Sequence, residues 1–411
     1  MSLYKRSGIK LFARNEIFCK KINMKQTLRN SIFLVIFVFV SVDIVAQEKQ
    51  FSPVHTAIPS LSIAPDARGG SMGDIGVSTL PDINSQYWNP SKYAFMESKA
   101  GVSLSYTPWL RKLVSDVSLA YLSGYYKLGQ GDRSALSASL RYFTLGEIQM
   151  TEYGGNVYQN IFPYEMSFDM GYSMKLSESS SMGVTLRYIR ADMGTNLDDE
   201  LQPDNAFAAD ISGYTERYVY LGSSESLWSG GFNISNIGTK VSFDGGATNE
   251  FLPANLRLGT GLLVPMDEYN QIGFYLDLNK YLVPVYPMRK ADETDDVFQQ
   301  RKNDYNSISN GLIGAIKSFS GESFSDQLSG INISFGAEYN YNSQFFVRGG
   351  YHHENQLKGN RRYFSAGAGF KMSVFQLDAA YLISTVQSNP LDQTLRFSLS
   401  FDMDGLKSLF Q

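Results

Sequence analysis

Apolar and polar residues alternate with a period of two along most of the chain beyond residue 97. Between Tyr164 and Leu176 every second residue is apolar, and the positions between them include Glu165 and Asp169. Because successive side chains of a strand point to opposite faces, this segment has one apolar and one polar face. It is longer than the 5–6 residues common in soluble sheets and reaches the roughly 9–11 residues with which a tilted strand crosses a bilayer.

About fourteen segments share this alternation. They start near residues 98, 115, 134, 164, 182, 205, 228, 252, 270, 331, 344, 361, 374 and 393. An even number of strands is typical of single-chain outer-membrane barrels. The pattern therefore predicts an all-β fold, a transmembrane antiparallel β-barrel of about 14 strands that occupies residues 98–411.

The connections between these segments also alternate in length. Short ones follow the second, fourth, eighth, tenth and twelfth segments, at 128–132, 177–181, 265–269, 342–343 and 371–373. Longer ones lie at 144–163, 191–204, 236–251 and 282–330. Short periplasmic turns and longer outer loops are expected of such a barrel. The sixth connection, 214–227, is too long for a turn, so the sixth strand either runs further or is misplaced.

The start of the chain has the parts of an export signal. An apolar run at 32–42 follows Lys25 and Arg29 and is followed by Ala46. A basic region, a short apolar region and a small residue are typical of a secretory signal peptide, and the run is short for a membrane-spanning helix. We therefore predict an upstream extension at 1–23, a signal peptide at 24–46 and cleavage between Ala46 and Gln47.

Composition narrows the class of protein further. Only 18% of the 411 residues are charged, whereas 14% are aromatic, which disfavours helix-rich soluble enzymes and disordered proteins. Removing residues 1–46 leaves a net charge of −10 and no cysteine, since the single Cys19 lies in that part. An acidic chain without cysteine is a poor nucleic-acid binder and has neither disulfides nor a cysteine-based zinc site. We expect no cofactor.

Residues 47–97 precede the alternating segments and lack their period. The segment contains Gly69, Gly70, Gly73 and Gly76, but their spacing is not that of a dinucleotide fingerprint, and no Walker A motif is present. We predict a plug in the lumen of the barrel, with a mobile gate as the alternative. Charges on the polar face must look into the lumen, where we expect them to pair with one another and with the plug: Glu165, Asp169, Lys175, Arg187 and Arg396.

Catalysis has little support in the sequence. Beyond the signal region the histidines are His55, His352 and His353, and the adjacent pair points to opposite faces of a strand. A lipid A deacylase would need one of that pair to activate a serine on the lipid-facing wall. No serine motif points to either histidine, so we expect no enzyme.

The loop at 282–330 is the longest connection, and loops of this length are usually functional or disordered. Its apolar residues have helix-like spacing near the end: Leu312, Ile313, Ile316 and Phe319. We predict a short helix packed on the rim of the barrel and a loop that contacts a protein partner together with 144–163. The alternative is a lid over the lumen.

Several blocks of this sequence resemble the PorV (LptO) family of type IX secretion, whose members are FadL-like barrels. They are PDARGGSMGDIGV at 65–77, Trp88-Asn89-Pro90, LPANLRLGTGL at 252–262, the block at 336–370, FQLDAAYLI at 375–383 and NPLDQTLRFSLSF at 389–401. The residues of the N-terminal segment that carry the family signature are Asp66, Arg68, Gly73, Asp74, Trp88, Asn89 and Pro90.

The resemblance implies a non-enzymatic outer-membrane carrier. Such proteins collect folded cargo from a giant translocon barrel (Sov- or SprA-like), bind its C-terminal β-sandwich signal domain and deliver it to a PorU-like cysteine sortase. The sortase attaches the cargo to lipopolysaccharide, so outer-membrane lipid and lipopolysaccharide are further expected partners, and nucleic acid is not. The alternative is a FadL-like transporter of hydrophobic small molecules, which needs an apolar lumen where a carrier can be plugged.

Overall fold

The computed structural model of the protein describes residues 51–111, 114, 116–129, 131, 133–151, 155–194, 202–222, 224–245, 248–289, 293–320, 323–386 and 391–403. The predicted extension, signal peptide and cleavage site between Ala46 and Gln47 lie outside these residues. Residues 51–411 form one compact unit.

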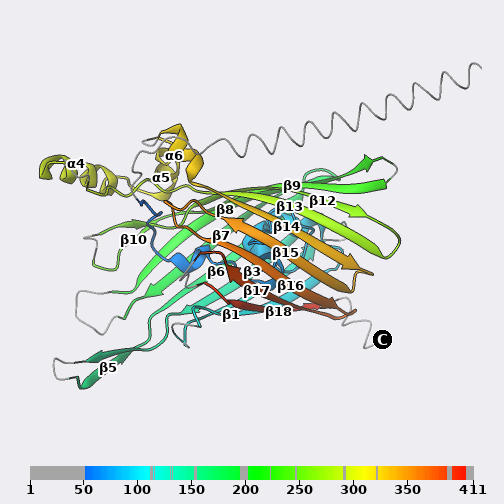
Figure 1. Ribbon diagram of the computed structural model, residues 1–411, viewed down its shortest axis with the longest axis horizontal. Coiled ribbons are helices and arrows are strands. Elements are labelled where there is room, and N and C mark those ends of the chain that lie inside the picture. The colour runs from blue at the N-terminus through cyan, green and yellow to red at the C-terminus, as the bar shows by residue number, and fades with distance from the viewer. Residues whose placement is uncertain are drawn as a thin grey trace, which may run out of the picture. The chain divides into compact units, whose positions relative to one another are not determined.

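Fourteen antiparallel strands close into a barrel (Figure 1). In chain order they are β1 (Ala100–Pro108), β2 (Ser118–Leu128), β3 (Ser134–Thr144), β6 (Tyr164–Lys175), β7 (Ser180–Asp192), β8 (Asp204–Leu221), β9 (Ser224–Gly238), β12 (Asn255–Pro265), β13 (Asn270–Tyr281), β14 (Ile331–Tyr341), β15 (Phe345–His353), β16 (Arg362–Lys371), β17 (Phe375–Ser384) and β18 (Leu395–Asp402). Pairing of β1 with β18, in which Val102 lies opposite Phe401, closes the sheet. The predicted fold and strand count are confirmed.

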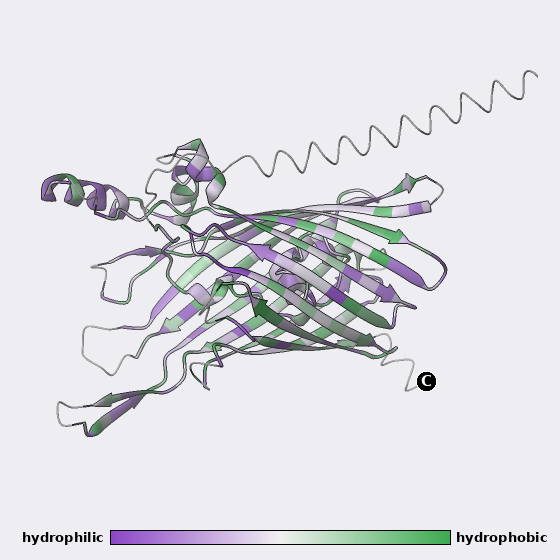
Figure 2. Cartoon of the chain, viewed as in Figure 1, coloured by the Kyte–Doolittle hydropathy of each residue, from purple (hydrophilic) through white to green (hydrophobic). Residues whose placement is uncertain are grey.

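The alternation along each strand separates a lipid face from a lumen face. On β1 the outward residues Leu104 and Tyr106 are exposed, whereas the inward residues Ser103 and Ser105 are buried. The same alternation gives the other strands their pattern of hydrophobic and hydrophilic residues (Figure 2). A closed barrel pairs the strand backbone within the sheet, and the apolar outward side chains suit hydrocarbon.

The two ends of the barrel differ in the length of their connections. At one end, short turns join β2 to β3, β6 to β7, β12 to β13, β14 to β15 and β16 to β17. The sixth connection belongs with them, because β8 continues to Leu221 and β9 already begins at Ser224. The sixth strand thus runs further than its apolar pattern shows. By the rule for outer-membrane barrels, this short-turn end is periplasmic.

The opposite end carries the long connections. They contain the hairpin β4 (Ile148–Thr151) with β5 (Val157–Ile161), the ribbon β10 (Lys240–Val241) with β11 (Glu250–Phe251), and the helices α4 (Asp295–Asn306), α5 (Gly311–Lys317) and α6 (Phe324–Ser329). Within the described part of the chain, no helix is long and apolar enough to cross a membrane.

The segment before β1 lies inside the barrel and is called the hatch here (residues 51–98). It forms only short helices: η1 (Pro59–Ser62), α2 (Ala67–Gly70), α3 (Ser85–Trp88) and η2 (Pro90–Phe95). Inward polar side chains of distant strands bond to its backbone: Glu165 of β6 accepts from the Ser60 N–H, and Ser398 of β18 accepts from the Ala67 N–H. Figure 1 shows this blue segment among the strands.

Candidate functional site

The signature residues Asp66 and Trp88 meet at the centre of the hatch. Asp66 caps α2, where its carboxylate accepts from the Gly69 N–H at 2.7 Å and from the Trp88 indole N–H at 2.6 Å. Burial and the nearby Asp82 raise the pKa of Asp66 to about 6, although both hydrogen bonds act in the opposite direction. The indole ring packs against Gly69 and Gly76, where no Cβ would fit without displacing it.

Gly73 and Asp74 lie where the hatch contacts the barrel wall. Gly73 has a φ of +80°, and a Cβ there would lie 2.8 Å from the backbone of Tyr351 on β15, so only glycine suits this position. Asp74 follows, also with positive φ, and its carboxylate accepts at 2.5 Å from both the Arg396 guanidinium and the Tyr363 hydroxyl. Burial alone would raise the pKa of Asp74, but the Arg396 guanidinium holds it below its usual value.

Arg68 joins the hatch to a buried ion-pair network. Its guanidinium donates to both carboxylate oxygens of Glu338 on β14, at 3.1 and 2.9 Å, and to Asp82 of the hatch at 2.8 Å. Glu338 is shared with Arg348 of β15, which also pairs with Asp378 of β17. A buried ion pair costs several kcal/mol when one partner is removed, so this network fixes the hatch to three neighbouring parts of the wall.

Asn89 and Pro90 begin η2 and tie it to the far side of the lumen. The Asn89 amide donates at 2.9 Å to the carbonyls of Val77 and Gly213, and Pro90 is the first residue of the short helix. The fully buried Lys92 then donates to the Gly76 carbonyl at 2.8 Å. Burial lowers the pKa of Lys92 to about 8. Six of the seven signature residues are thus buried, and Asp74 is partly buried.

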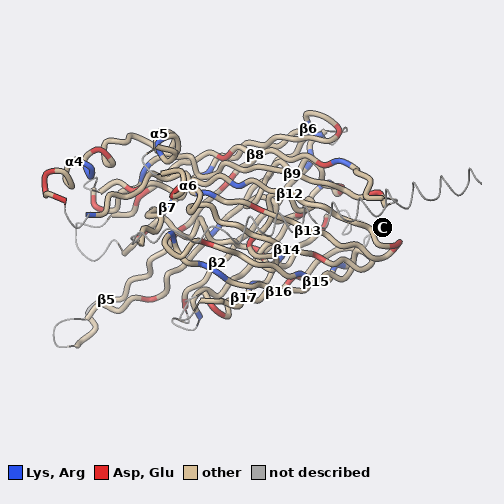
Figure 3. The backbone as a smooth tube through the Cα atoms, turned by 45° about the horizontal axis from the view of Figure 1, so that its top comes forward, with Lys and Arg blue, Asp and Glu red and all other residues tan. Residues whose placement is uncertain are grey.

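Inward charges of the wall pair with one another, as the alternation predicted. Figure 3 marks the charged positions along the chain. Arg187 bridges Asp169 at 2.7 Å and Asp210 at 3.0 Å. Two other predicted residues reach the hatch, since Glu165 bonds Ser60 and the Lys175 ammonium lies 4.4 Å from the Phe95 ring centroid. These charges therefore serve the structure of the lumen.

A small gap lies between the hatch and the wall in the described part of the chain. This gap of about 10 Å³ is lined mainly by polar groups, among them Arg141, Arg187 and Arg257. That volume is about enough for one water molecule, whereas sites for small molecules usually span about 300–1,000 Å³. Arg257 and Arg141 also lie over the Tyr87 ring, at 4.5 and 5.1 Å from its centroid. This part of the lumen offers no apolar pocket.

A serine and a histidine do meet in this barrel, but on the lumen face. Ser334 and His352 are opposite each other on β14 and β15, with Oγ and Nδ1 2.8 Å apart. Both side chains are buried, and His352 stacks on Tyr363 under the hatch residue Asp74. A deacylase would need such a pair on the lipid-facing wall. Among the described residues no cluster of metal-ligating side chains is present either.

The predicted helix near residue 312 exists, but its apolar side faces outward. In α5 the small residues Gly311, Gly314 and Ala315 pack against the wall, beside Gly238 and Phe251. The four apolar residues of the prediction have exposed fractions between 40% and 67%, and they are called the apolar patch here: Leu312, Ile313, Ile316 and Phe319. Exposed apolar patches commonly mark interaction sites.

The helices sit outside the barrel wall. Ala315 of α5 belongs to a core that packs against Ile234 of β9 and Leu256 of β12, two outward-facing residues. Lys280, outward on β13, donates to the Gln327 carbonyl of α6, and its ammonium lies 5.8 Å from the Phe319 ring centroid. The alternative of a lid over the lumen therefore does not describe α5 and α6.

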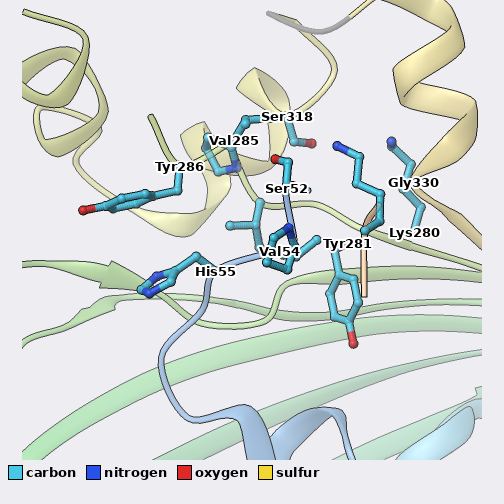
Figure 4. A pocket seen from close by; sticks show the side chains of 13 residues that line it. Ser52, Val54, His55, Lys280, Tyr281, Val285, Tyr286, Ser318 and Gly330 are labelled. Carbon is cyan, nitrogen blue, oxygen red and sulfur yellow. The ribbon is translucent and has the colours of Figure 1, made fainter. Parts of the chain in front are cut away.

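A small cleft lies beneath these helices (Figure 4). It has a volume of about 40 Å³ and is lined by Ser52 and His55 of the hatch, Lys280 and Tyr281 of β13, and Tyr286. The rings of His55 and Tyr286 are in contact, with centroids 5.0 Å apart and planes tilted by 33°. The cleft joins the start of the hatch to the outer helices.

Sequence reasoning missed several residues on which the site depends. Asp82, Lys92 and Glu338 anchor the hatch, yet only Glu338 stands in a clear alternation, where its polar position indicates the lumen face. The partners of Asp82 and Lys92 lie in a non-periodic segment, so no pattern indicates their contacts.

These features define a class: an outer-membrane β-barrel of fourteen strands whose lumen is filled by its own N-terminal segment. The family model of the type IX secretion system protein PorV matches residues 45–288, more than half of the chain. The chain belongs to this family and is a component of type IX secretion. It resides in the outer membrane.

Similar folds occur among solved structures. The Pseudomonas putida toluene transporter TodX is 11% identical, with 86% of this chain and 99% of that chain covered and a TM-score of 0.47. The monoaromatic hydrocarbon channel CymD is also 11% identical, with coverages of 82% and 96% and a TM-score of 0.45. A Pseudomonas aeruginosa FadL homologue is 12% identical, with coverages of 86% and 100% and a TM-score of 0.40. Likenesses this distant carry no weight for function. No curated protein matches the chain.

Proposed function

We propose that this protein is a non-enzymatic carrier that binds the C-terminal β-sandwich domain of secreted cargo, collects the cargo from the translocon barrel and delivers it to a PorU-like sortase. The observation that carries the proposal is the filled lumen in a chain of the PorV family. A carrier can hold its cargo on outer loops and needs no path through the barrel.

The filled lumen favours this function over small-molecule transport. A transporter of hydrophobic compounds needs an apolar cavity of ligand size, whereas the gap beside the hatch is polar and holds about 10 Å³. Opening the lumen would also break the pairs of Arg68 with Glu338 and of Asp74 with Arg396. Each is a buried charge pair whose separation costs several kcal/mol.

The surface that we propose for partner contact is the apolar patch on α5 together with the β4–β5 hairpin. α6 adds Phe324 and Leu328, and the Gln327 amide fixes it to α5 by donating to the Ser318 carbonyl at 2.8 Å. The hairpin segment carries the exposed residues Ile148, Val157 and Phe162. Both groups lie at the end opposite the short turns, where cargo and sortase would be met.

The test is co-purification of tagged protein from its native envelope, comparing wild type with the double variant Leu312→Ser, Ile316→Ser. We expect the variant to lose about tenfold or more of the cargo bearing C-terminal β-sandwich domains, because central apolar contacts each contribute more than about 1 kcal/mol. The barrel should stay folded, since both side chains are exposed. Folding is checked by the heat-dependent shift in gel mobility.

The matched control is Met266→Ser, an equally exposed apolar residue in a periplasmic turn. It should leave recovery of cargo, translocon and sortase unchanged. Equal recovery from the double variant would refute the proposed contact surface. If wild type instead yields none of these partners but holds an apolar small molecule, the transporter alternative is correct.

A further inference from the structure

At the periplasmic end, the hairpin of β8 and β9 extends beyond β7, its neighbour on one side. Pairing of β7 with β8 ends at Ser180 opposite Thr215, because β7 begins at Ser180. β8 nevertheless continues to Leu221 and pairs there only with β9, down to Ser224. Residues 217–221 therefore form an open edge on the β7 side, whereas on the other side β12 pairs with β9 as far as Leu227. The hairpin ends among the short turns at the right of Figure 1.

This edge presents unpaired backbone groups in a regular order. The Glu216 N–H donates to the Ser179 carbonyl, which places the polar backbone groups of Glu216 on the β7 side. The backbone N–H and C=O groups of successive strand residues point alternately to the two sides of the strand. Those of Tyr218 and Tyr220 therefore point to the same side as those of Glu216. No described strand lies beside them. Two N–H and two C=O groups are thus directed into the space next to the hairpin.

The side chains of the edge are also open. Tyr218 and Tyr220 lie on the face that continues the lumen side of β8 and are 71% and 74% exposed. Arg217, Val219 and Leu221 alternate with them on the other face, where Leu221 is exposed as well. Natural sheets protect such an edge with proline, a bulge, charged side chains or a short edge strand. Residues 217–221 contain no proline and pair with β9 without a bulge, and Arg217 is the one charged residue among them.

We propose that residues 217–221 are a docking edge at which an extended segment of a periplasmic protein adds to the barrel sheet as a further strand. An added strand forms hydrogen bonds with all four backbone groups of Tyr218 and Tyr220, because its own N–H and C=O groups have the same spacing. The side chains of a helix do not have that spacing. Because cross-strand pairs favour apolar with apolar and opposite charges, the segment carries apolar residues beside Val219 and Leu221 and an acidic residue beside Arg217. Its occupant comes from the periplasm, because this end of the barrel carries the short turns.

The proposed edge is separate from the proposed cargo surface. The apolar patch on α5 lies at the long-loop end, whereas the turn between β8 and β9 lies among the short turns of the opposite end. The inference depends only on the orientation of the barrel, so it stands or falls independently of cargo binding.

The test places a photo-reactive p-benzoylphenylalanine at Tyr218 in the full chain, in its native cells, and follows the cross-linked product. Adding Tyr220→Pro removes one edge N–H but leaves pairing with β9, because the Tyr220 N–H points away from β9. We expect this change to lower the yield about tenfold, from loss of hydrogen bonds at the edge. Tyr220→Ala, which keeps the backbone N–H, should retain most of the product. Mass spectrometry should place the cross-link in an extended segment of a periplasmic protein.

Two controls make each outcome decisive. The same photo-reactive residue at Tyr269, exposed in the turn between β12 and β13, should not give this product. Heat-dependent gel mobility confirms that each variant is folded. Absence of a product at position 218, equal loss in the proline and alanine variants, or cross-linking only to a second copy or to lipid would each overturn the proposal.

Discussion

Two charges of the hatch have partners that lie far away in sequence. Arg68 meets Glu338 in a pair that is almost inaccessible to solvent, and Asp74, which is partly exposed, meets the buried Arg396. Burying an unpaired charge would cost far more than a small domain can supply, so these pairs must form together with the barrel. The residue types predict pairing in the lumen, but they do not indicate which partner each charge finds.

The raised pKa of Asp66 predicts how the stability of the hatch depends on pH. Its folded pKa of about 6 lies above the usual value of 3.8, so the protonated form favours the folded hatch. Its contribution is present below about pH 4 and is lost as the pH rises through about 6. Asp66→Asn keeps the helix cap but stays neutral. Relative to wild type, its protection from hydrogen exchange at residues 66–76 should rise by up to about a hundredfold between pH 4 and 7.

Hydrogen exchange is measured on both proteins at each pH, so the intrinsic dependence on pH cancels. Glu268→Gln, in the exposed turn between β12 and β13, serves as the control. The protection of its residues 66–76 relative to wild type should be the same at every pH. If the protection of Asp66→Asn relative to wild type is also the same at every pH, the ionised Asp66 carboxylate does not oppose folding.

Among the elements, α5 shows how spacing can predict a helix and still leave its orientation open. Asn310 caps it by accepting from the Ile313 N–H at 3.1 Å. Gly311 and Gly314 then allow the helix backbone to approach Gly238 and Phe251 closely. The small residues therefore take the packed side, and the apolar residues, which in an isolated amphipathic helix would face the core, remain outside.

This packing predicts that Gly314→Leu detaches α5 without unfolding the barrel. A Cβ at Gly314 would lie 2.7 Å from the Phe251 ring, and overpacking of this kind costs about 1–3 kcal/mol. Hydrogen-exchange protection of residues 311–317 should fall while that of the strands is unchanged. Ile316→Ala, at an exposed position of the same helix, should leave the protection of α5 nearly as in wild type. Equal loss in both variants would contradict the docking through Gly314.

At the scale of the whole molecule, the number of strands sets the size of the barrel interior, and the hatch lies in that interior. A barrel of fourteen strands has an interior between that of eight-stranded barrels, which side chains fill, and that of the water-filled porins with 16–18 strands. The hatch occupies this interior through bonds to β6, β13, β16 and β18. The outer face of the wall thus suits lipid, and the N-terminal segment of the chain lies in the interior.

We therefore expect wild-type protein in planar lipid bilayers to conduct almost no current, whereas deletion of residues 51–96 produces a stable open pore. The deletion removes every described helix of the hatch but none of the strands. Heat-dependent gel mobility shows whether the shortened barrel is folded. Steady conductance of the wild type at the level of the deletion variant would show that the lumen is open and would favour the transporter.

The sequence by itself determined the barrel, its strand number and most strand starts, because each strand must alternate between lipid and lumen. Thirteen of the fourteen starts agree with the structure within three residues, and β9 begins at Ser224 instead of near 228. The exception is physically informative. Beyond Thr215, where pairing with β7 ends, the apolar alternation that marks a strand fades while pairing of β8 with β9 continues.

Only the tertiary structure decided what fills and surrounds this barrel. The hatch has no period, and its place in the lumen follows from pairs such as Arg68 with Glu338, which are 270 residues apart. The packed side of α5, the lumen-facing Ser334 and His352, and the open edge at Tyr218 and Tyr220 likewise depend on which neighbours the closed sheet provides. A repeating physical constraint can be recognised along a chain, whereas a single contact between distant residues exists only once the chain is folded.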